Sequence, residues 1–325
     1  MQGVSVAIAF NVRGLCVRAE LETQKLNMET QFNNSTNVED STSARLTQNP
    51  CYVQCGLELN KIYNESNLDT MKRMPDNFID LTVTSPPYDG LRDYKGYSFP
   101  FEEIAKELYR VTKQGGVVVW IVGDATKNGS ESGTSFRQAL YFIELGFNLH
   151  DTMIYSSRKP PLTHNRYEQE FEYMFILSKG RPNTFNPIKI KTNFAGDVKK
   201  FNHGKITDAK KEKGKSVRWR DEKLIVNETR IKGNIWDYPT GMNGSSKDKL
   251  AFLHPAIFPE RLAEDHIVSW SNEGDIVYDC FGGSGTTAKM AHKWKRNWIL
   301  SEISKEYVEI AEKRIAPYLA QTSLF

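Results

Sequence analysis

The chain has 325 residues and a formal net charge of +3, with 39% hydrophobic and 26% charged side chains. This is the composition of an ordinary soluble globular protein, long enough to bury a large core as one domain or as a domain with an insertion. No apolar stretch approaches the ~20 residues of a membrane span, and no Lys or Arg precedes the short apolar run at residues 4–10, as a signal peptide would require. The four cysteines at positions 16, 51, 55 and 280 have the spacing of neither a disulfide framework nor a zinc site. We therefore expect a cytoplasmic protein with no bound metal and no membrane contact.

The first part of the chain divides into an extension and an alternating segment. Residues 1–50 are rich in Asn, Ser, Thr and Gln without a sustained hydrophobic period, so we expect a disordered N-terminal extension. Strand and helix signals alternate over residues 51–182. They predict helices at 101–112 and 134–145, and strands at 79–83, 116–122 and 171–177. The last of these strands is expected to pair with residues 149–155.

A basic segment at residues 183–246 interrupts this alternation. Between residues 181 and 232 there are fifteen Lys and Arg but six Asp and Glu, a local charge of +9 that leaves −6 for the rest of the chain. A basic block inserted in a mildly acidic body is typical of a surface that contacts phosphates, although a solvated lysine-rich loop would have the same charge.

The alternation resumes over residues 247–325. We predict helices at 259–270 and 284–293, strands at 275–278 and 297–300, and a last helix at 304–316, with Ser304 as its N-cap and Pro317 beyond its end. Strands that alternate with helices indicate an α/β fold, with a mostly parallel twisted sheet covered by helices on both faces.

The sequence CFGGSGTT at residues 280–287 follows the strand that ends at Asp279. A strand, a glycine turn and a helix form the nucleotide-type crevice of open α/β sheets, and Glu302, about twenty residues further on, could accept both ribose hydroxyls. The Lys of a phosphate-binding P-loop is missing, and a dehydrogenase would place GxGxxG near the start of its domain. S-adenosylmethionine, which has no pyrophosphate, fits better. A tight turn without a ligand is the remaining alternative.

The sequence TSPPY at residues 84–88 follows a predicted buried strand. Its prolines restrict φ and remove backbone N–H donors, which leaves carbonyl oxygens free to face a cleft. The Ser85 hydroxyl and the Pro86 carbonyl could accept the two hydrogens of a base amine, while Tyr88 stacks on the base. Taken alone, the same string is equally consistent with an ordinary proline-rich strand exit.

The third string, HPAIFP at residues 254–259, makes the pattern specific. The order SPPY, basic insert, HPAxFP, DxFGGSGTT and then a Glu resembles the β-class of site-specific DNA methyltransferases, which modify exocyclic amines. The resemblance covers residues 57–317. It implies a Rossmann-like methyltransferase fold, S-adenosylmethionine as cofactor, and duplex DNA as partner, with a cognate restriction endonuclease possible elsewhere. It also implies a catalytic half at 51–182, a target-recognition insert at 183–246 and a cofactor half at 247–325.

The resemblance assigns roles to individual residues. The catalytic turn would consist of Ser85, Pro86, Pro87 and Tyr88. The cofactor site would contain Asp279, Phe281, Gly282, Gly283, Ser284, Gly285, Thr286, Glu302, Phe258, Pro259 and Asp124. Asp124 could instead be a strand-end acid that is satisfied within the protein. Two departures stand out: Cys280 replaces a frequent Pro, and Ser66, beside Glu65, replaces an Asp that contacts adenine in the family.

The resemblance further implies that Ser85, where adenine-N6 enzymes mostly carry Asp, favours cytosine N4 as the methylated atom, with adenine N6 as the alternative. The target base must be flipped out of the duplex. We expect the insert and a loop after the catalytic turn to bind DNA through Lys199, Lys200, Lys210, Lys211, Arg218, Arg220 and Arg92. An inactive DNA-binding protein, or a methyltransferase for RNA or protein amines, are alternatives from other classes.

Overall fold

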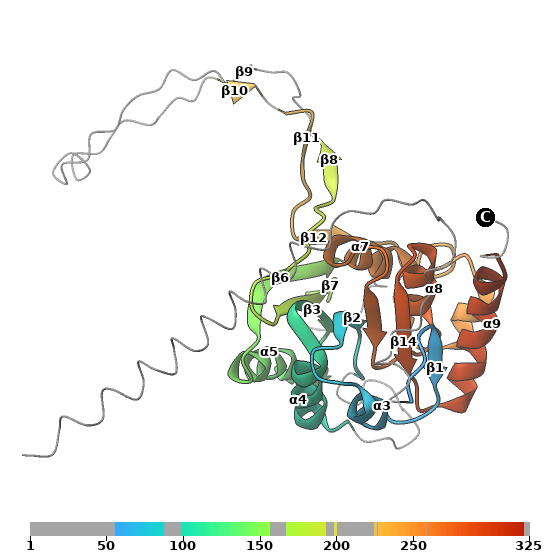
Figure 1. Cartoon of the computed structure of the whole chain (residues 1–325). Coiled ribbons are helices and arrows are strands. Elements are labelled where there is room, and N and C mark those ends of the chain that lie inside the picture. Colours follow the sequence, from blue (N-terminus) through green and yellow to red (C-terminus); the bar gives the residue numbers. More distant parts are fainter. Residues whose placement is uncertain are drawn as a thin grey trace, which may run out of the picture. The chain divides into compact units, whose positions relative to one another are not determined.

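The computed structural model describes residues 56–87, 99–156, 167–192, 198–199, 224–225, 227–257 and 259–321 (Figure 1). All of them belong to the second of two units into which the chain divides, residues 50–325. The predicted N-terminal extension at 1–50 lies outside the described residues. None of the helices in the described ranges has the length and apolar composition to cross a membrane.

An eight-stranded sheet organises this unit, in the order β1-β14-β13-β2-β3-β7-β6-β12. Neighbouring strands are parallel except where β7 pairs with β3 and β6, so the predicted mostly parallel sheet is confirmed. The strands are β1 (Lys61–Tyr63), β14 (Asn297–Ser301), β13 (Ile276–Asp279), β2 (Ile79–Thr84), β3 (Thr112–Val122), β7 (Phe171–Ser178), β6 (Asn148–Ser156) and β12 (Ile235–Asp237).

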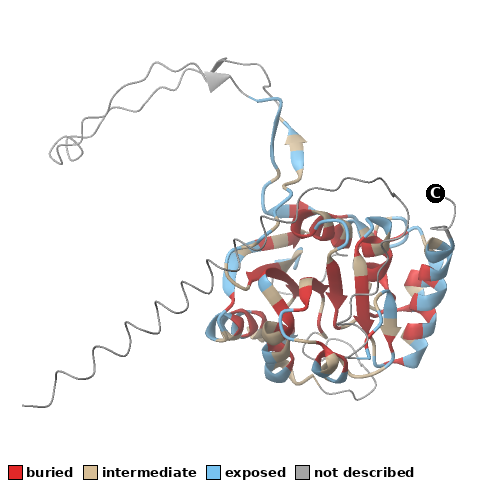
Figure 2. Cartoon of the chain, viewed as in Figure 1, coloured by how far each residue is buried: buried red, intermediate tan, exposed pale blue. Residues whose placement is uncertain are grey.

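Helices cover both faces of the sheet, as the nearly continuous burial of its central strands requires (Figure 2). In β3, Val118 and Trp120 face one core while Val117 and Val119 face the other, because successive strand residues point to opposite faces. The first core includes residues of α3 (Asn67–Arg73), α4 (Phe101–Val111) and α5 (Thr134–Glu144). The second includes residues of α7 (Glu260–Trp270), α8 (Thr286–Lys293) and α9 (Lys305–Gln321).

The last helix is longer than the sequence predicted. It begins after Ser304, as expected, but it continues through Pro317 to Gln321. A proline in the helix interior removes one backbone hydrogen bond, but near an exposed C-terminus the freed carbonyl can bond to water. The prediction that the helix ends before Pro317 was therefore wrong.

The two ends of the basic segment pair with each other. β8 (Lys189–Lys191) is antiparallel to β11 (Thr229–Ile231), and β9 (Val198–Lys199) is antiparallel to β10 (Leu224–Ile225). The chain then enters β12, which joins the central sheet beside β6. A short antiparallel pair, β4 (Thr126–Lys127) and β5 (Ser130–Glu131), and a 3₁₀ helix, η1 (Lys249–Leu253), complete the described elements.

Candidate active site

The predicted functional turns lie along one edge of the sheet. Because β1, β14, β13, β2 and β3 are mutually parallel, their carboxyl ends meet there, and we call this the carboxyl edge. Ser85 follows β2, the glycine turn follows β13, and Glu302 follows β14. Since β13 pairs directly with β2, the two motif turns are neighbours. The edges of open α/β sheets where strands end are the usual position of ligand sites.

Two glycines give the turn after β13 its form. Gly283 and Gly285 have φ values of +49° and +78°, in the left-handed region that side chains disfavour. A Cβ on Gly285 would lie 2.9 Å from the Ala311 Cβ of α9, and one on Gly283 would lie 3.2 Å from His254 Nε2. The turn therefore needs glycine both for its conformation and for close packing against its neighbours.

Glu302 contacts the glycine turn directly. The backbone N–H of Gly283 donates to its Oε2 at 2.8 Å, and that of Ser304 donates to its Oε1 at 2.8 Å. Burial raises the pKa of Glu302, and these backbone hydrogen bonds oppose the shift. Each carboxylate oxygen has a second acceptor position, so the predicted contact with two ribose hydroxyls is chemically available.

Asp279 is buried beneath the turn, with 1% of its surface exposed. Its Oδ1 accepts from Thr84 Oγ1 at 2.7 Å and from the Phe281 N–H at 3.1 Å, and its Oδ2 accepts from Thr287 Oγ1 at 2.7 Å. Burial raises the pKa of Asp279, while the hydrogen bonds from Thr287 and Thr84 lower it. Both carboxylate oxygens thus have partners within the protein.

Arg314 of α9 makes hydrogen bonds to Ser284 and Thr286. The buried Arg314 guanidinium donates to the Ser284 carbonyl, to Ser284 Oγ at 2.8 Å and to Thr286 Oγ1 at 3.2 Å. It also bonds Glu260 Oε1 at 2.8 Å and Asp248 Oδ2 at 3.0 Å. The sequence reasoning missed Arg314, because a basic residue late in an amphipathic helix normally indicates a solvated face.

The HPAIFP string passes beside the same turn. The buried His254 accepts from the Ala256 N–H at its Nδ1, 3.1 Å away, and its ring lies 4.2 Å from that of Tyr307. Pro259 is buried at the N-terminus of α7. Phe258 lies outside the described residues.

The catalytic turn is described as far as Pro87. Pro86 is buried, while Ser85 and Pro87 are partly exposed at the carboxyl edge. Tyr88 and Arg92 lie outside the described residues.

Phe281, at the start of the glycine turn, joins an aromatic group in the first core. Its ring centroid lies 5.7 Å from that of Phe99 and 6.3 Å from that of Trp120. Gly282, the next residue, packs against β14, since a Cβ there would lie 3.1 Å from Leu300 Cδ2. These contacts anchor the turn on the sheet.

Asp124 follows β3 and caps α5. It accepts from the Ser135 N–H and from Ser132 Oγ, each at 3.0 Å, from Thr134 Oγ1 at 3.2 Å, and from the Ser135 hydroxyl. Burial would raise the pKa of Asp124, but these hydrogen bonds outweigh burial and lower it. These contacts are those expected of a strand-end acid whose hydrogen bonds are satisfied within the protein, which was the alternative to a cofactor-binding role.

The loop after β1 also departs from the family pattern. Ser66 caps α3, with its Oγ accepting from the Leu68 N–H at 3.3 Å, and Glu65 bonds Thr70 and Arg73. Both side chains thus make contacts with α3. Asn67 instead reaches the glycine turn, donating from Nδ2 to the Cys280 carbonyl at 3.1 Å. Sequence spacing gave no signal for this contact, which spans 213 positions.

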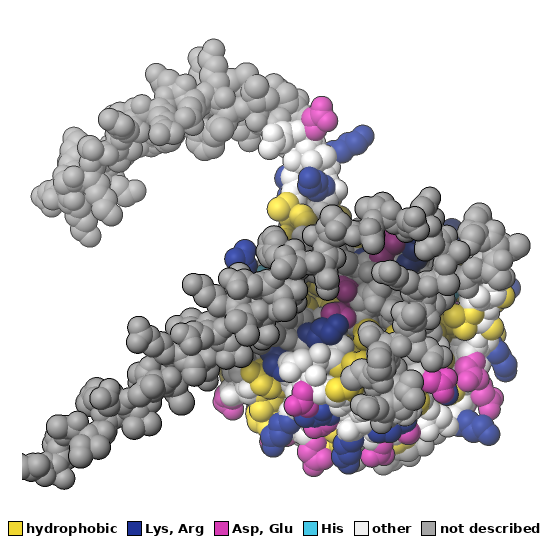
Figure 3. Space-filling model, in the orientation of Figure 1, with side chains coloured by type: hydrophobic (Ala, Val, Ile, Leu, Met, Phe, Trp, Pro, Cys, Tyr) yellow, Lys and Arg dark blue, Asp and Glu magenta, His cyan; other side chains and the backbone are white. Residues whose placement is uncertain are grey.

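Most predicted DNA-binding residues lie outside the described part of the chain: Lys200, Lys210, Lys211, Arg218 and Arg220. For Lys199 only the strand β9 is described. At the base of the insert, β8 and β11 bring the exposed Lys189, Lys191 and Arg230 onto one ribbon (Figure 3). This ribbon was not identified from the sequence, although its residues contribute to the basic charge.

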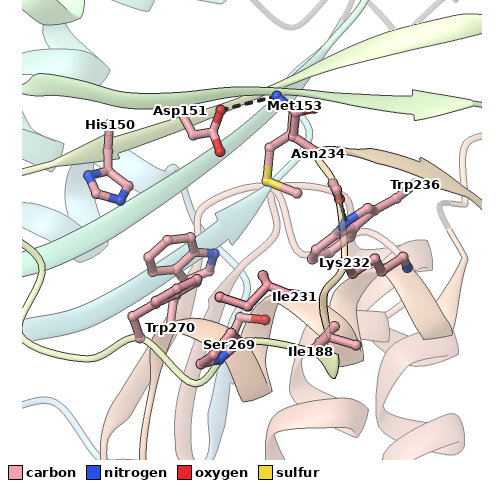
Figure 4. Close-up of a pocket in the computed structure, with 13 residues that line it drawn as sticks. His150, Asp151, Met153, Ile188, Ile231, Lys232, Asn234, Trp236, Ser269 and Trp270 are labelled. Atoms are coloured by element: carbon pink, nitrogen blue, oxygen red, sulfur yellow. Dashed lines mark hydrogen bonds between the residues drawn. The ribbon is translucent and has the colours of Figure 1, made fainter. Parts of the chain in front are cut away.

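A separate cavity of about 130 Å³ lies away from these turns (Figure 4). It is lined by His150 near the start of β6, Trp270 at the end of α7, and Lys232 and Trp236 near β12. No residue of the two motif turns lines it. The start of β6 and the end of α7 place it towards the opposite edge of the sheet, so we locate the candidate active site at the turns.

Comparisons with known proteins identify the family of this chain. The sequence profile of the DNA methylase family matches residues 79–313. The orphan methyltransferase M.BamHII of Bacillus amyloliquefaciens is 60% identical over 242 residues, which are 74% of this chain and 90% of that protein.

Two solved structures share the fold. The PvuII DNA methyltransferase (cytosine-N4-specific) has a TM-score of 0.55 and 21% identity, with 80% of this chain and 91% of that one covered. TTHA0409 from Thermus thermophilus, a putative DNA modification methylase complexed with S-adenosyl-L-methionine, has a TM-score of 0.53 and 22% identity, with 79% and 93% covered. At these identities the likeness is one of fold.

Proposed function

The chain belongs to the DNA methylase family of N6- and N4-amino methyltransferases, and from this premise we propose that it transfers a methyl group from S-adenosylmethionine to the N4 amine of a flipped cytosine in duplex DNA. One observation carries the proposal. The Ser85 turn and the Gly283 turn end adjacent parallel strands and are joined through Thr84 and Asp279. A methyl donor and a base amine held by these two turns would meet at one edge of the sheet.

The residues present fit S-adenosylmethionine. Glu302 offers acceptor positions beside the glycine turn and accepts a hydrogen bond from the Gly283 N–H. Each of three side chains makes a hydrogen bond to the turn: Asn67, Asp279 and Arg314. When bound, S-adenosylmethionine supplies an electrophilic methyl group on its sulfonium. The chain itself contributes the position and orientation of the turn.

The catalytic turn would orient the acceptor amine. The Ser85 hydroxyl and the Pro86 carbonyl would accept its two hydrogens, which directs the nitrogen lone pair out of conjugation and towards the methyl group. Tyr88 would stack on the flipped base and offset part of the few kcal/mol that flipping costs. Rate enhancement then comes chiefly from positioning two reactants and excluding water. The nitrogen–carbon bond would form as the carbon–sulfur bond breaks, S-adenosylhomocysteine would leave, and the methylated amine would release one proton to water, so no covalent enzyme intermediate is required.

The choice of cytosine over adenine rests on Ser85. A serine hydroxyl is a neutral acceptor where adenine-N6 members of the family mostly carry an Asp carboxylate. The relative M.BamHII is called an orphan methyltransferase, which favours an enzyme that acts without a companion endonuclease. The ribbon of β8 and β11, with the basic segment between them, would contact DNA phosphates. Lysines and arginines clustered on one element neutralise the negative charge of the DNA backbone.

The direct test incubates the purified protein with tritiated S-adenosylmethionine and with DNA, RNA or protein, then digests the DNA product to nucleosides. We expect label in N4-methylcytosine, and none with Ser85→Ala. Label only in N6-methyladenine would overturn the choice of base. Binding of S-adenosylmethionine and DNA without transfer would instead favour an inactive DNA-binding protein, and label in RNA or protein would favour the remaining alternative.

Two further variants separate the proposed roles of the turns. Tyr88→Ala should lower turnover more than cofactor affinity, because stacking acts on the base. Gly283→Val should abolish cofactor binding, because a side chain at its φ of +49° is strained and would meet the His254 ring, 3.2 Å from the Cβ position, so the turn would be displaced. Isothermal titration with S-adenosylmethionine and single-turnover methylation measure the two quantities. An equal loss of cofactor affinity in both variants would contradict this division.

A further inference from the structure

The proposed reaction needs the two turns to be held at a set separation. The backbone pairing of β13 with β2 joins Val277 to Leu81 and Tyr278 to Thr82, and it ends before either turn begins. Beyond that point, Thr84 Oγ1 donates to Asp279 Oδ1 at 2.7 Å. This side-chain hydrogen bond therefore continues the connection between the strands where the backbone ladder has stopped.

We propose that Thr84, Asp279 and Thr287 form a clamp whose purpose is to position the catalytic turn against the cofactor turn, so that donor and acceptor meet at reactive distance. Thr84 directly precedes Ser85, Asp279 precedes the glycine turn, and Thr287 lies in the first turn of α8. One carboxylate thus links the catalytic turn, the cofactor turn and the helix behind it. The inference rests on the proposed function and names residues that position rather than react.

The two threonine hydroxyls are the hydrogen-bond donors to Asp279 in the clamp. Thr84 Oγ1 donates to Asp279 and accepts from Cys280 Sγ at 3.6 Å. Burial raises the pKa of the Cys280 thiol, so it remains protonated and can donate to this hydroxyl. Thr287 Oγ1 fills the other Asp279 oxygen at 2.7 Å. Thr84 and Thr287 are fully buried and Asp279 nearly so, so water does not compete for these hydrogen bonds.

The same strand offers a matched control. Thr82, two residues earlier in β2, is also fully buried, but its hydroxyl has no hydrogen-bond partner within the described structure. Thr82→Val and Thr84→Val are both isosteric changes in one strand. They differ in whether a hydrogen bond to Asp279 is lost, so general damage to β2 can be separated from loss of the clamp.

The experiment compares Thr84→Val, Thr84→Ser and Thr82→Val in the full-length protein. We expect Thr84→Val to lower the single-turnover rate about 10–100-fold, as a misplacement of up to about 1 Å can do, with less than threefold change in the dissociation constant for S-adenosylmethionine. Thr84→Ser, which keeps the hydroxyl, should recover most of the rate. Thr82→Val should behave as wild type.

Amide hydrogen exchange gives a second readout that does not depend on activity. Without the clamp, the N–H groups of Ser85 and Phe281 should exchange at least about tenfold faster in Thr84→Val and not in Thr82→Val, because both turns gain local freedom. If the wild type is active, and Thr84→Val shows the same methylation rate and the same amide exchange as the wild type, the clamp is overturned. A loss confined to cofactor affinity, or equal losses in the two valine variants, would also overturn it. A wild type that exchanges as expected but transfers no methyl group would overturn the proposed function alone.

Discussion

Each edge of the central sheet contains a buried arginine, and the two have different surroundings. At the carboxyl edge, Arg314 is fully buried and bonds two carboxylates together with the glycine turn. At the amino edge, where β13 and β14 begin, Arg296 is 7% exposed and bonds Ser271 Oγ at 3.1 Å, and the Ser271 and Trp294 carbonyls at 2.6 Å.

The difference shows which edge is organised around a turn. Arg296 joins the end of α7 to the start of β14, and its hydrogen-bond partners in the described structure are neutral. Burial lowers the pKa of Arg296, with opposing effects from Asp275 and Glu273. Arg314 gathers Asp248, Glu260 and Ser284 from three separate segments. At the amino edge, the buried arginine joins α7 to β14. At the carboxyl edge, the buried arginine supports the glycine turn of the candidate site.

The largest expected effect comes from Arg314→Met. The change leaves the Asp248 and Glu260 carboxylates without this partner, so we expect the free energy of unfolding to fall by about 3–5 kcal/mol. Urea denaturation measures this. If that variant does not fold, Arg314→Lys keeps the charge but not the forked geometry, and it should weaken S-adenosylmethionine binding in a calorimetric titration.

Arg296→Met should be milder. It leaves the Trp294 carbonyl without its donor, while the Ser271 carbonyl keeps a hydrogen bond from Asn186 Nδ2 and no carboxylate is unpaired, so the cost should be about 1–3 kcal/mol. S-adenosylmethionine affinity of the folded variant should match wild type. A loss of affinity equal to that of the Arg314 variants would break the comparison between the edges.

A pair of glycines, one at each edge, sharpens the comparison between the two edges. Gly285 and Gly274 have φ values of +78° and +87°, so alanine should cost about 1–2 kcal/mol at either. A Cβ on Gly285 would meet Ala311, while one on Gly274, at the amino edge, would meet nothing within 4 Å. Gly285→Ala should therefore also weaken S-adenosylmethionine binding, by about tenfold if displacement of the turn costs about 1.4 kcal/mol. Thermal unfolding and cofactor titration of both variants provide the check.

The smallest expected effect concerns two acids with opposite pKa shifts. For Asp124, hydrogen bonds from α5 outweigh burial and lower the pKa. Its contribution to stability is therefore present above the unfolded value of about 3.9 and is lost as pH falls through the lower folded value. Burial raises the pKa of Asp275 at the amino edge, so the native state loses stability as pH rises from about 3.9 through the folded value.

Unfolding at several pH values distinguishes these acids. Asp124→Asn keeps an acceptor but loses the negative charge at the start of α5, so it should be most destabilising, by about 0.3–1 kcal/mol, at neutral pH and least at the acid end. The stability of Asp275→Asn relative to wild type should instead improve as pH rises from about 3.9 through the folded pKa of Asp275. Parallel pH profiles for the two variants would contradict the assigned directions.

The amino-acid sequence by itself determined the alternation of strands and helices, the two motif turns and the Glu after β14. These signals are local. Apolar periodicity reports burial, and a glycine turn after a strand reports a left-handed backbone whatever surrounds it. The order of the motifs along the chain carried the family resemblance, which the comparisons confirmed. The roles of individual site residues stay predictions.

The tertiary structure alone decided how the turns are held. Thr84 and Asp279 are 195 positions apart, Asn67 and Cys280 are 213 apart, and Arg314 reaches Ser284 across 30. Each of these polar groups could equally have faced solvent, and nothing in its neighbouring residues indicates a partner. Strand order brings them together at one edge of the sheet. Burial then favours pairing there, because a polar group shielded from water costs free energy when it lacks a hydrogen bond.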